Sequence, residues 1–150
     1  MIKELEEIYS PSGMEQELKG YLQNKLNGIC DRVWCDRMGN LHAEKGNNSL
    51  KPVFACHMDE PGIIVTKITD DGYIKFETVG RVKPEFLVSK RVKINGCVGI
   101  ISLKAVHLTT KEERKTPVKL SQLFIDIGAD SAEQAEKAVM PGDYGTFCTD

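Results

Sequence analysis

The stretch PVFACHMDE, residues 52–60, joins an apolar segment to a cluster of polar groups. Residues 52–56 are all apolar, and an unbroken run of this kind is typical of a strand buried on both faces of a sheet. We therefore predict a strand over residues 52–57 within a layered α/β domain. Residues two apart in an extended chain face the same side, so His57 and Asp59 are expected to converge at the carboxyl edge of that sheet, where open α/β sheets bind ligands.

The His57–Asp59 spacing has a functional and a structural interpretation. One nitrogen of a neutral imidazole can bind a metal ion, while the other needs an acceptor such as a carboxylate to fix the ring. The same spacing also describes a polar strand end with a solvated aspartate, and the spacing alone leaves both interpretations open. Cys56 and His57 are not expected to form a nucleophile–base pair, because adjacent strand residues point to opposite faces.

The sequence before this stretch predicts two helices and two strands. Apolar residues at helical spacing predict a short first helix that includes Ile2, Leu5, Ile8 and Tyr9. After a break at residues 10–13, Ser12 and Glu15 have the spacing of a capping box for a second helix. Its apolar face is formed by Met14, Leu18, Leu22 and Leu26, and it ends at Asn27-Gly28. Short strands are expected at 32–35 and 41–44.

The character of the sequence changes near residue 62. Short strands separated by the turn signals at 70–72 and 95–96 predict a small antiparallel sheet or barrel. The expected strands are 63–68, 73–79, 88–94, 98–102, 123–127 and 144–148. A short helix is expected to begin at Ser131, with Gln134 as its capping-box partner. The chain is therefore expected to form an α/β part and then a β-rich part.

Composition excludes several classes of partner. The 20 basic and 22 acidic residues give a net charge of −2, which does not predict a basic stripe for nucleic acid. The mixed charges of residues 111–115 are expected on a solvated loop. No apolar run approaches the roughly 20 residues of a membrane span, and the acidic N-terminus is unlike a signal peptide, so a cytoplasmic location is expected. Five cysteines without a C-x-x-C pair do not predict a disulfide framework.

Five stretches occur in an order that is found in one family of peptidases. They are SPSGME at 10–15, DRMGNL at 36–41, HMDE at 57–60, LFIDIGA at 123–129 and PGD at 141–143. Together they resemble the glutamyl/deblocking aminopeptidase family, the TET-type peptidases with two metal ions, over nearly the whole chain. The chain departs from the family at Pro61, where a β-branched residue is usual, and at Gly80, where a glycine pair is often found.

The resemblance implies a fold and a mode of assembly. It implies that residues 1–62 are part of an α/β/α metallopeptidase domain, and that 63–143 form an inserted antiparallel β domain, barrel-like or PDZ-like, used in subunit contact. Residues 144–150 would return to the peptidase domain. The protein would be a homo-oligomer acting on peptides, without a nucleic-acid or membrane partner.

The resemblance also implies site residues and cofactors. His57 matches the family's first metal ligand, and Asp59 matches the catalytic acidic residue that orients it. The metals would be two zinc or cobalt ions bridged by a water. The family's other ligands, which include a bridging aspartate and a late histidine, follow the inserted domain, so His57 is the one direct ligand carried over. His42 and His107 are expected to be structural or surface residues.

Three interpretations follow for function. The first is that the chain is a truncated portion of a metal-dependent aminopeptidase. The second is a non-catalytic oligomerisation or binding module in which His57 and Asp59 are vestigial. A glycoside hydrolase ranks last, because it needs two carboxylates about 5–10 Å apart across a cleft, and no such pair is singled out by the sequence.

Overall fold

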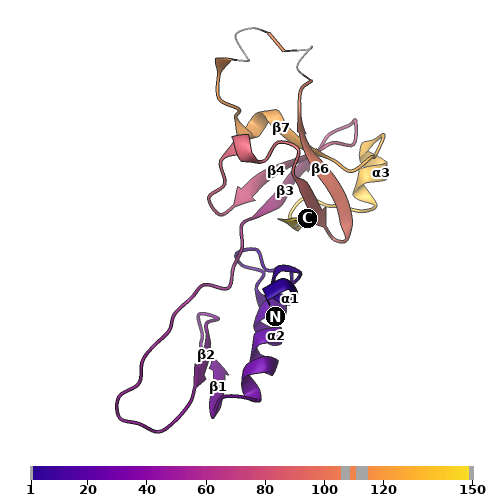
Figure 1. Ribbon diagram of the computed structural model, residues 1–150. Coiled ribbons are helices and arrows are strands. Elements are labelled where there is room, and N and C mark those ends of the chain that lie inside the picture. The colour runs from indigo at the N-terminus through magenta and orange to yellow at the C-terminus, as the bar shows by residue number, and fades with distance from the viewer. Residues whose placement is uncertain (1, 106–108, 111–114, 149–150) are drawn as a thin grey trace. The chain divides into compact units, whose positions relative to one another are not determined.

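The computed structural model describes residues 2–105, 109–110 and 115–148. The chain divides into two compact units, Met1–Asp59 and Glu60–Asp150, and Figure 1 shows the elements of each. The loop charges predicted at 111–115 fall almost wholly outside the described residues, as does His107.

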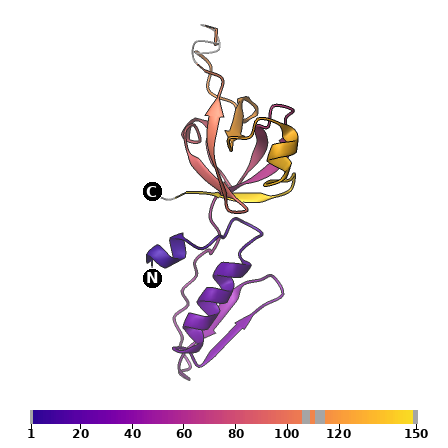
Figure 2. The same ribbon diagram turned by 90° about the vertical axis from the view of Figure 1, so that its right-hand side faces the viewer.

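The first unit is built from helix α2 and a two-stranded sheet. Its elements are α1 (Ile2–Glu6), α2 (Gln16–Asn27), β1 (Arg32–Cys35) and β2 (Leu41–Glu44). Strands β1 and β2 pair antiparallel, with Trp34 opposite His42. Helix α2 packs beside both strands (Figure 2), and its Leu18 is buried. The predicted strands at 32–35 and 41–44 are confirmed, while the first helix ends earlier than its apolar spacing suggested.

The strand predicted at residues 52–57 is not present. Residues 51–59 form neither helix nor strand, and the side chains of Val53 and Phe54 are 88% and 92% exposed. A strand buried on both faces needs backbone partners and packed layers on either side. Among the described residues of this unit, β2 pairs with β1 alone. The apolar run therefore has the composition of a core strand, but among the described residues of this unit it has no adjacent strand to pair with.

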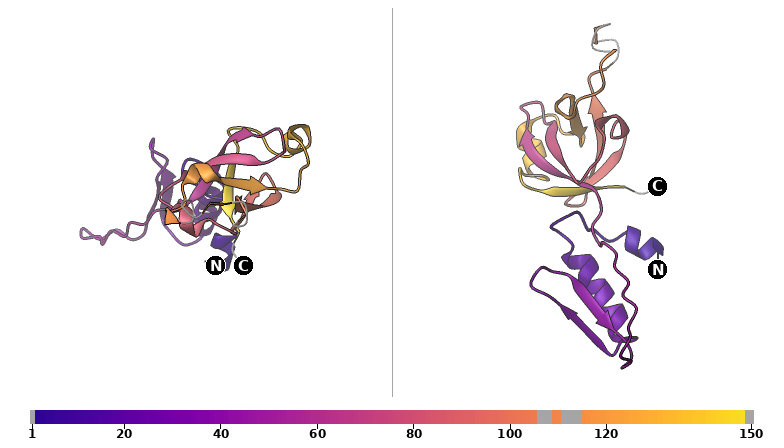
Figure 3. Two further views of the ribbon diagram at one scale, coloured as in Figure 1. Left: turned by 90° about the horizontal axis from the view of Figure 1, so that it is seen from above. Right: turned by 90° about the vertical axis from the view of Figure 1, so that its left-hand side faces the viewer.

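The second unit is a closed antiparallel barrel, which confirms the predicted antiparallel β-rich part. Its strands, in the order in which they pair, are β3 (Gly62–Ile68), β4 (Ile74–Val79), β7 (Leu123–Asp126), β6 (Cys97–Leu103), β5 (Arg91–Ile94) and β8 (Tyr144–Phe147). Figure 3 shows the barrel from two further directions. The described part of the unit also contains the short helices η1 (Pro84–Phe86), η4 (Leu120–Gln122) and α3 (Ala132–Glu136). The assignment of residues 144–150 to the peptidase domain stays a prediction; in the barrel, β8 pairs with β3 and β5.

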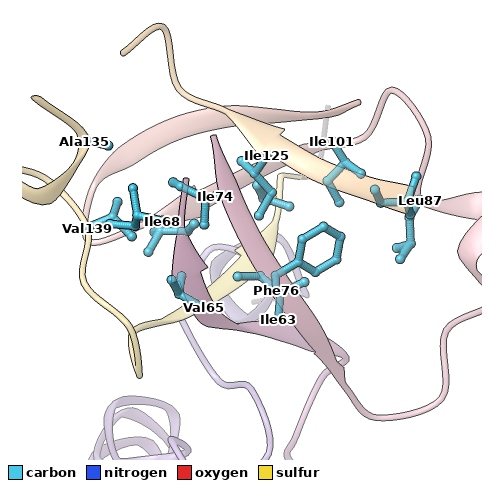
Figure 4. Close-up of a cluster of buried hydrophobic side chains, with 13 residues drawn as sticks. Ile63, Val65, Ile68, Ile74, Phe76, Leu87, Ile101, Ile125, Ala135 and Val139 are labelled. Atoms are coloured by element: carbon cyan, nitrogen blue, oxygen red, sulfur yellow. The ribbon is translucent and has the colours of Figure 1, made fainter. Parts of the chain in front are cut away.

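The barrel closes around side chains that alternate along its strands. The buried cluster, shown in Figure 4, consists of Ile63, Val65, Ile68, Ile74, Phe76, Leu87, Val92, Ile94, Ile101, Leu123, Ile125, Ala135 and Val139. A Cβ at Gly145 would lie 2.7 Å from Cγ1 of Ile94 and 3.1 Å from Cδ1 of Ile63. Glycine at this position therefore lets β8 lie close against both of its neighbours.

Three residues with positive φ set the start and the turn of the β5–β6 hairpin. Ser89 has a φ of 66°, which interrupts the strand predicted from residue 88, so β5 begins at Arg91. Asn95 and Gly96 have φ values of 50° and 84°, as a two-residue hairpin turn requires.

Helix α3 begins as predicted, because Ser131 at its N-cap accepts the backbone N–H of Gln134 at 3.3 Å.

Candidate metal-ligand site at His57 and Asp59

The extended segment of residues 51–59 brings the two predicted site residues together. The Nδ1 atom of His57 lies 3.2 Å from Oδ1 of Asp59 and 2.9 Å from the backbone carbonyl oxygen of the same residue. The imidazole is 85% exposed, and the Asp59 side chain is 39% exposed. The ring is therefore held by polar contacts on one side and is open to ligands on the other.

The contacts of Nδ1 fix the tautomer of the neutral His57 ring. A backbone carbonyl oxygen can only accept a hydrogen bond, so Nδ1 must carry the hydrogen. The lone pair of the neutral ring is then on Nε2. This is the arrangement found in metal-bound histidines, where an acceptor holds one ring nitrogen and leaves the other free for the metal.

A third residue, Ser12, holds the other side of the Asp59 carboxylate. The Ser12 hydroxyl donates to Oδ2 of Asp59, while Oδ1 faces His57. The hydrogen bond from the Ser12 hydroxyl, followed in effect by one from the backbone N–H of Asp59 itself and then by the nearby His57, lowers the pKa of Asp59 below its ordinary value. Asp59 is therefore ionised at neutral pH and available as an acceptor for the imidazole.

Ser12 does not form the capping box predicted from its spacing to Glu15. Helix α2 begins at Gln16, with Glu15 at the N-cap and no side-chain capping bond. Glu15 instead accepts the backbone N–H of Gly13 at 2.6 Å. Because the helix begins four residues after Ser12, this residue is not at the N-cap, and its hydroxyl contacts Asp59 instead. Sequence reasoning missed Ser12 as a site residue because its partner is 47 residues away, and no local spacing signals such a contact.

The second described histidine belongs to the β1–β2 hairpin. Nε2 of His42 lies 3.0 Å from Oδ2 of Asp36, and its ring stacks on Trp34 with centroids 5.0 Å apart. Its contacts are therefore those of a structural residue, as the sequence predicted.

The described residues do not assemble a full metal centre. Within 2–105, 109–110 and 115–148 there is no group of three or more His, Cys, Asp or Glu side chains placed to hold one ion. His57 and Asp59 fit the part of one ligand and its orienting acceptor. Structural and catalytic zinc sites use three or four protein ligands, so this pair alone makes a weak site.

None of the helices in the described part of the chain is long and apolar enough to cross a membrane.

Comparisons with known proteins give a consistent result. A family model described as M42 glutamyl aminopeptidase matches residues 39–150. A putative aminopeptidase of Acetivibrio thermocellus is 37% identical over 100% of this chain, which covers 44% of that protein. A TET aminopeptidase from a marine sediment archaeon of the Thaumarchaeota has a TM-score of 0.89 at 36% identity, over 97% of this chain and 43% of that one.

A further solved structure carries information on assembly. The TET1 peptidase of Pyrococcus horikoshii, described as assembling into a tetrahedron or a large octahedral shell, has a TM-score of 0.82 at 31% identity. The match covers 97% of this chain and 45% of that protein. The chain thus spans less than half the length of the relatives it matches. The match of the family model over residues 39–150, together with the resemblance of five ordered motifs, shows that this chain belongs to the M42 glutamyl aminopeptidase family.

Proposed function

We propose that this chain contributes the first metal ligand of a metal-dependent aminopeptidase that releases N-terminal residues from peptides in the cytoplasm. The observation that carries the proposal is the geometry of His57, whose Nδ1 is held by Asp59 at 2.9 and 3.2 Å. This contact leaves Nε2 with a lone pair directed away from its protein partner. Family membership supplies the reaction class, and the contact supplies the role of the residue.

The proposed cofactors are two divalent ions, zinc or cobalt. When bound, such a pair supplies a water of lowered pKa and positive charge for the developing oxyanion. The part of His57 is to donate Nε2, and the part of Asp59 is to keep that nitrogen aimed by accepting the Nδ1 hydrogen. Asp59 is thus a positioning residue in this proposal.

The remaining ligands are proposed to lie outside these 150 residues. Two observations support this: the described residues hold no cluster of three metal-ligating side chains, and the chain covers 44% of the A. thermocellus relative. On this proposal the chain is a truncated portion of a longer enzyme. By itself, it is expected to show no aminopeptidase turnover with added Zn²⁺ or Co²⁺.

The experiment combines mass and activity. We expect the protein isolated from its native cells to have an intact mass above 16.7 kDa and metal-dependent aminopeptidase activity. In that native protein His57→Ala should lower kcat/KM by more than about 100-fold, beyond the usual effect of losing an outer hydrogen-bond partner. The exposed Ser49 provides a matched control, since Ser49→Ala should leave activity unchanged.

Two results would contradict this proposal. Turnover by the 150-residue chain alone, lost in His57→Ala, would show that its own residues complete the site. A native mass of 16.7 kDa without activity would favour the alternative, a non-catalytic oligomerisation or binding module with a vestigial His57–Asp59 pair. This alternative is consistent with the described residues, which contain no group of three metal-ligating side chains.

The barrel is proposed to make homo-oligomer contacts. Two apolar residues on the outward face of β6, Val98 and Ile100, are 51% and 48% exposed, and they are two positions apart, so they share one face of the strand. The relative from P. horikoshii is described as able to assemble into a tetrahedron or a large octahedral shell. Ile100→Lys should therefore reduce the assembly size of the native protein in analytical ultracentrifugation, and an unchanged size would remove β6 from the proposed contact.

A further inference from the structure

We infer that Ser12 is a positioning residue for the metal ligand, acting on His57 through the Asp59 carboxylate. The inference rests on the proposed function, in which His57 donates Nε2 to a metal ion. It assigns the loop of residues 10–13 a part in the site, although Ser12 lies 47 positions before Asp59 in the sequence.

The contacts form a continuous series from the loop to the ring. Ser12 donates its hydroxyl hydrogen to Oδ2 of Asp59. The other oxygen, Oδ1, lies 3.2 Å from Nδ1 of His57. Since each carboxylate oxygen has a partner, rotation of the carboxylate is restricted, and Oδ1 stays aimed at the ring.

Polar contacts have to orient this ring because packing does not. The His57 side chain is 85% exposed, so surrounding side chains do not confine the ring, whereas the Asp59 side chain is 39% exposed. A ligand nitrogen on an exposed segment must nevertheless be held in one direction to bind a metal well. The hydroxyl of Ser12 anchors the carboxylate to a residue outside the segment that carries His57.

A helix-capping role does not account for Ser12. Helix α2 begins at Gln16 with Glu15 as its N-cap, and no side chain caps it. Removal of the Ser12 hydroxyl should therefore leave α2 intact and act on Asp59. This separation makes the inference testable by substitution.

The test measures which ring nitrogen of His57 carries the hydrogen in the metal-free chain. The chain contains three histidines, so the imidazole ¹⁵N signals can be resolved at about pH 8.5, where a histidine with an ordinary pKa near 6.5 is neutral. In the unsubstituted chain we expect the hydrogen of His57 on Nδ1. Ser12→Ala should lower the population of that tautomer, while Ser12→Thr, which keeps the hydroxyl, should preserve it. Ser49→Ala is the matched control and should change nothing.

The signals of His42 report whether the first unit remains folded. His42 lies 3.0 Å from Asp36 in the hairpin, and its resonances should not move in a folded variant. If the His42 resonances are lost in Ser12→Ala, the variant Ser12→Cys is used in place of Ser12→Ala, because a thiol has a similar size to a hydroxyl and is a weak donor. An unchanged His57 tautomer in the folded variant would overturn the inference, as would an equal shift in Ser12→Thr.

A Zn²⁺ titration separates this inference from the proposed function. Zn²⁺ should bind at Nε2 of His57 in the unsubstituted chain, and Ser12→Ala should weaken that binding about 10-fold, as for other outer hydrogen-bond partners of metal ligands. Absence of any Zn²⁺ effect on His57 would contradict the proposed metal ligand itself. If the tautomer population of His57 is the same in Ser12→Ala and Zn²⁺ still binds, only the role of Ser12 is contradicted.

Discussion

Asp36 accepts four hydrogen bonds at the turn between β1 and β2. The donors are the backbone N–H groups of Met38 and Asn40, the Asn40 side-chain amide and Nε2 of His42. Chiefly because of the bond from His42, and then that from the Asn40 side chain, the pKa of Asp36 is well below its ordinary value. The turn is therefore built around an ionised carboxylate.

This carboxylate makes the stability of the hairpin dependent on acid. Folding favours the ionised form of Asp36, so its contribution is complete above the unfolded pKa of about 3.9 and is lost as the pH falls below that value. Asp36→Asn should lower the melting temperature of the first unit at neutral pH. It should also flatten the decline of stability below about pH 4, as measured by thermal unfolding followed through Trp34 fluorescence.

A matched control exists in the same unit. Glu17 is exposed in the first turn of helix α2, where a negative charge contributes at most about 1 kcal/mol, so Glu17→Gln should change the melting temperature and its acid dependence much less than Asp36→Asn does. If Asp36→Asn kept the full decline of stability at low pH, other carboxyl groups would be responsible for the decline.

At the scale of the elements, residues 51–59 and strand β3 differ in whether their backbone is part of a hydrogen-bonded ladder. Both are rich in apolar side chains, but residues 51–59 form no strand, whereas β3 pairs with β4 and with β8. Backbone amides outside a hydrogen-bonded ladder exchange with solvent at low free-energy cost.

Hydrogen exchange should therefore separate the two segments in this chain. A peptide covering residues 51–59 should be fully deuterated within seconds, while one covering 62–68 should remain protected until the barrel opens. Mass spectrometry after pepsin digestion measures both in one sample. Comparable protection of the two peptides would show that the apolar segment has strand partners in solution.

The elements also show what sequence patterns can and cannot predict. The strands at 32–35 and 123–126 were predictable because alternation and turn residues are local, and their partners lie within the chain. The prediction of a strand at 52–57 was wrong, because an apolar run indicates buried surroundings and gives no information on backbone partners. The contact from Ser12 to Asp59 was likewise beyond reach, because it depends on two loops meeting across 47 residues. The convergence of His57 and Asp59 was predictable because extended backbone alone brings positions i and i+2 to one side.

At the scale of the whole molecule, the barrel is stabilised by one shared core. Ile125 on β7 is completely buried, whereas Ile100 on the neighbouring strand β6 is 48% exposed. The two residues have the same side chain in adjacent strands, and they differ in which face of the barrel they occupy.

This pair allows a matched test of the core. Ile125→Ala should reduce the free energy of unfolding of the barrel by about 2–5 kcal/mol, through lost burial and the cavity left behind. Ile100→Ala should cost much less, because its side chain remains half in water. Urea unfolding followed by the amide signals of β6 measures both. Equal losses would mean that Ile100 is buried in solution, as an assembly contact would make it.

The pairing of β3 with β8 places the first and last strands of the barrel side by side. Gly62 lies opposite Thr146 in that ladder, and Cα atoms paired across antiparallel strands are about 4.5–5.5 Å apart. A polypeptide that enters the barrel at β3 and leaves it at β8 thus travels almost no net distance. We therefore expect that a bridge of two or three glycines can replace the segment from β3 to β8 without re-routing the backbone at either end of it.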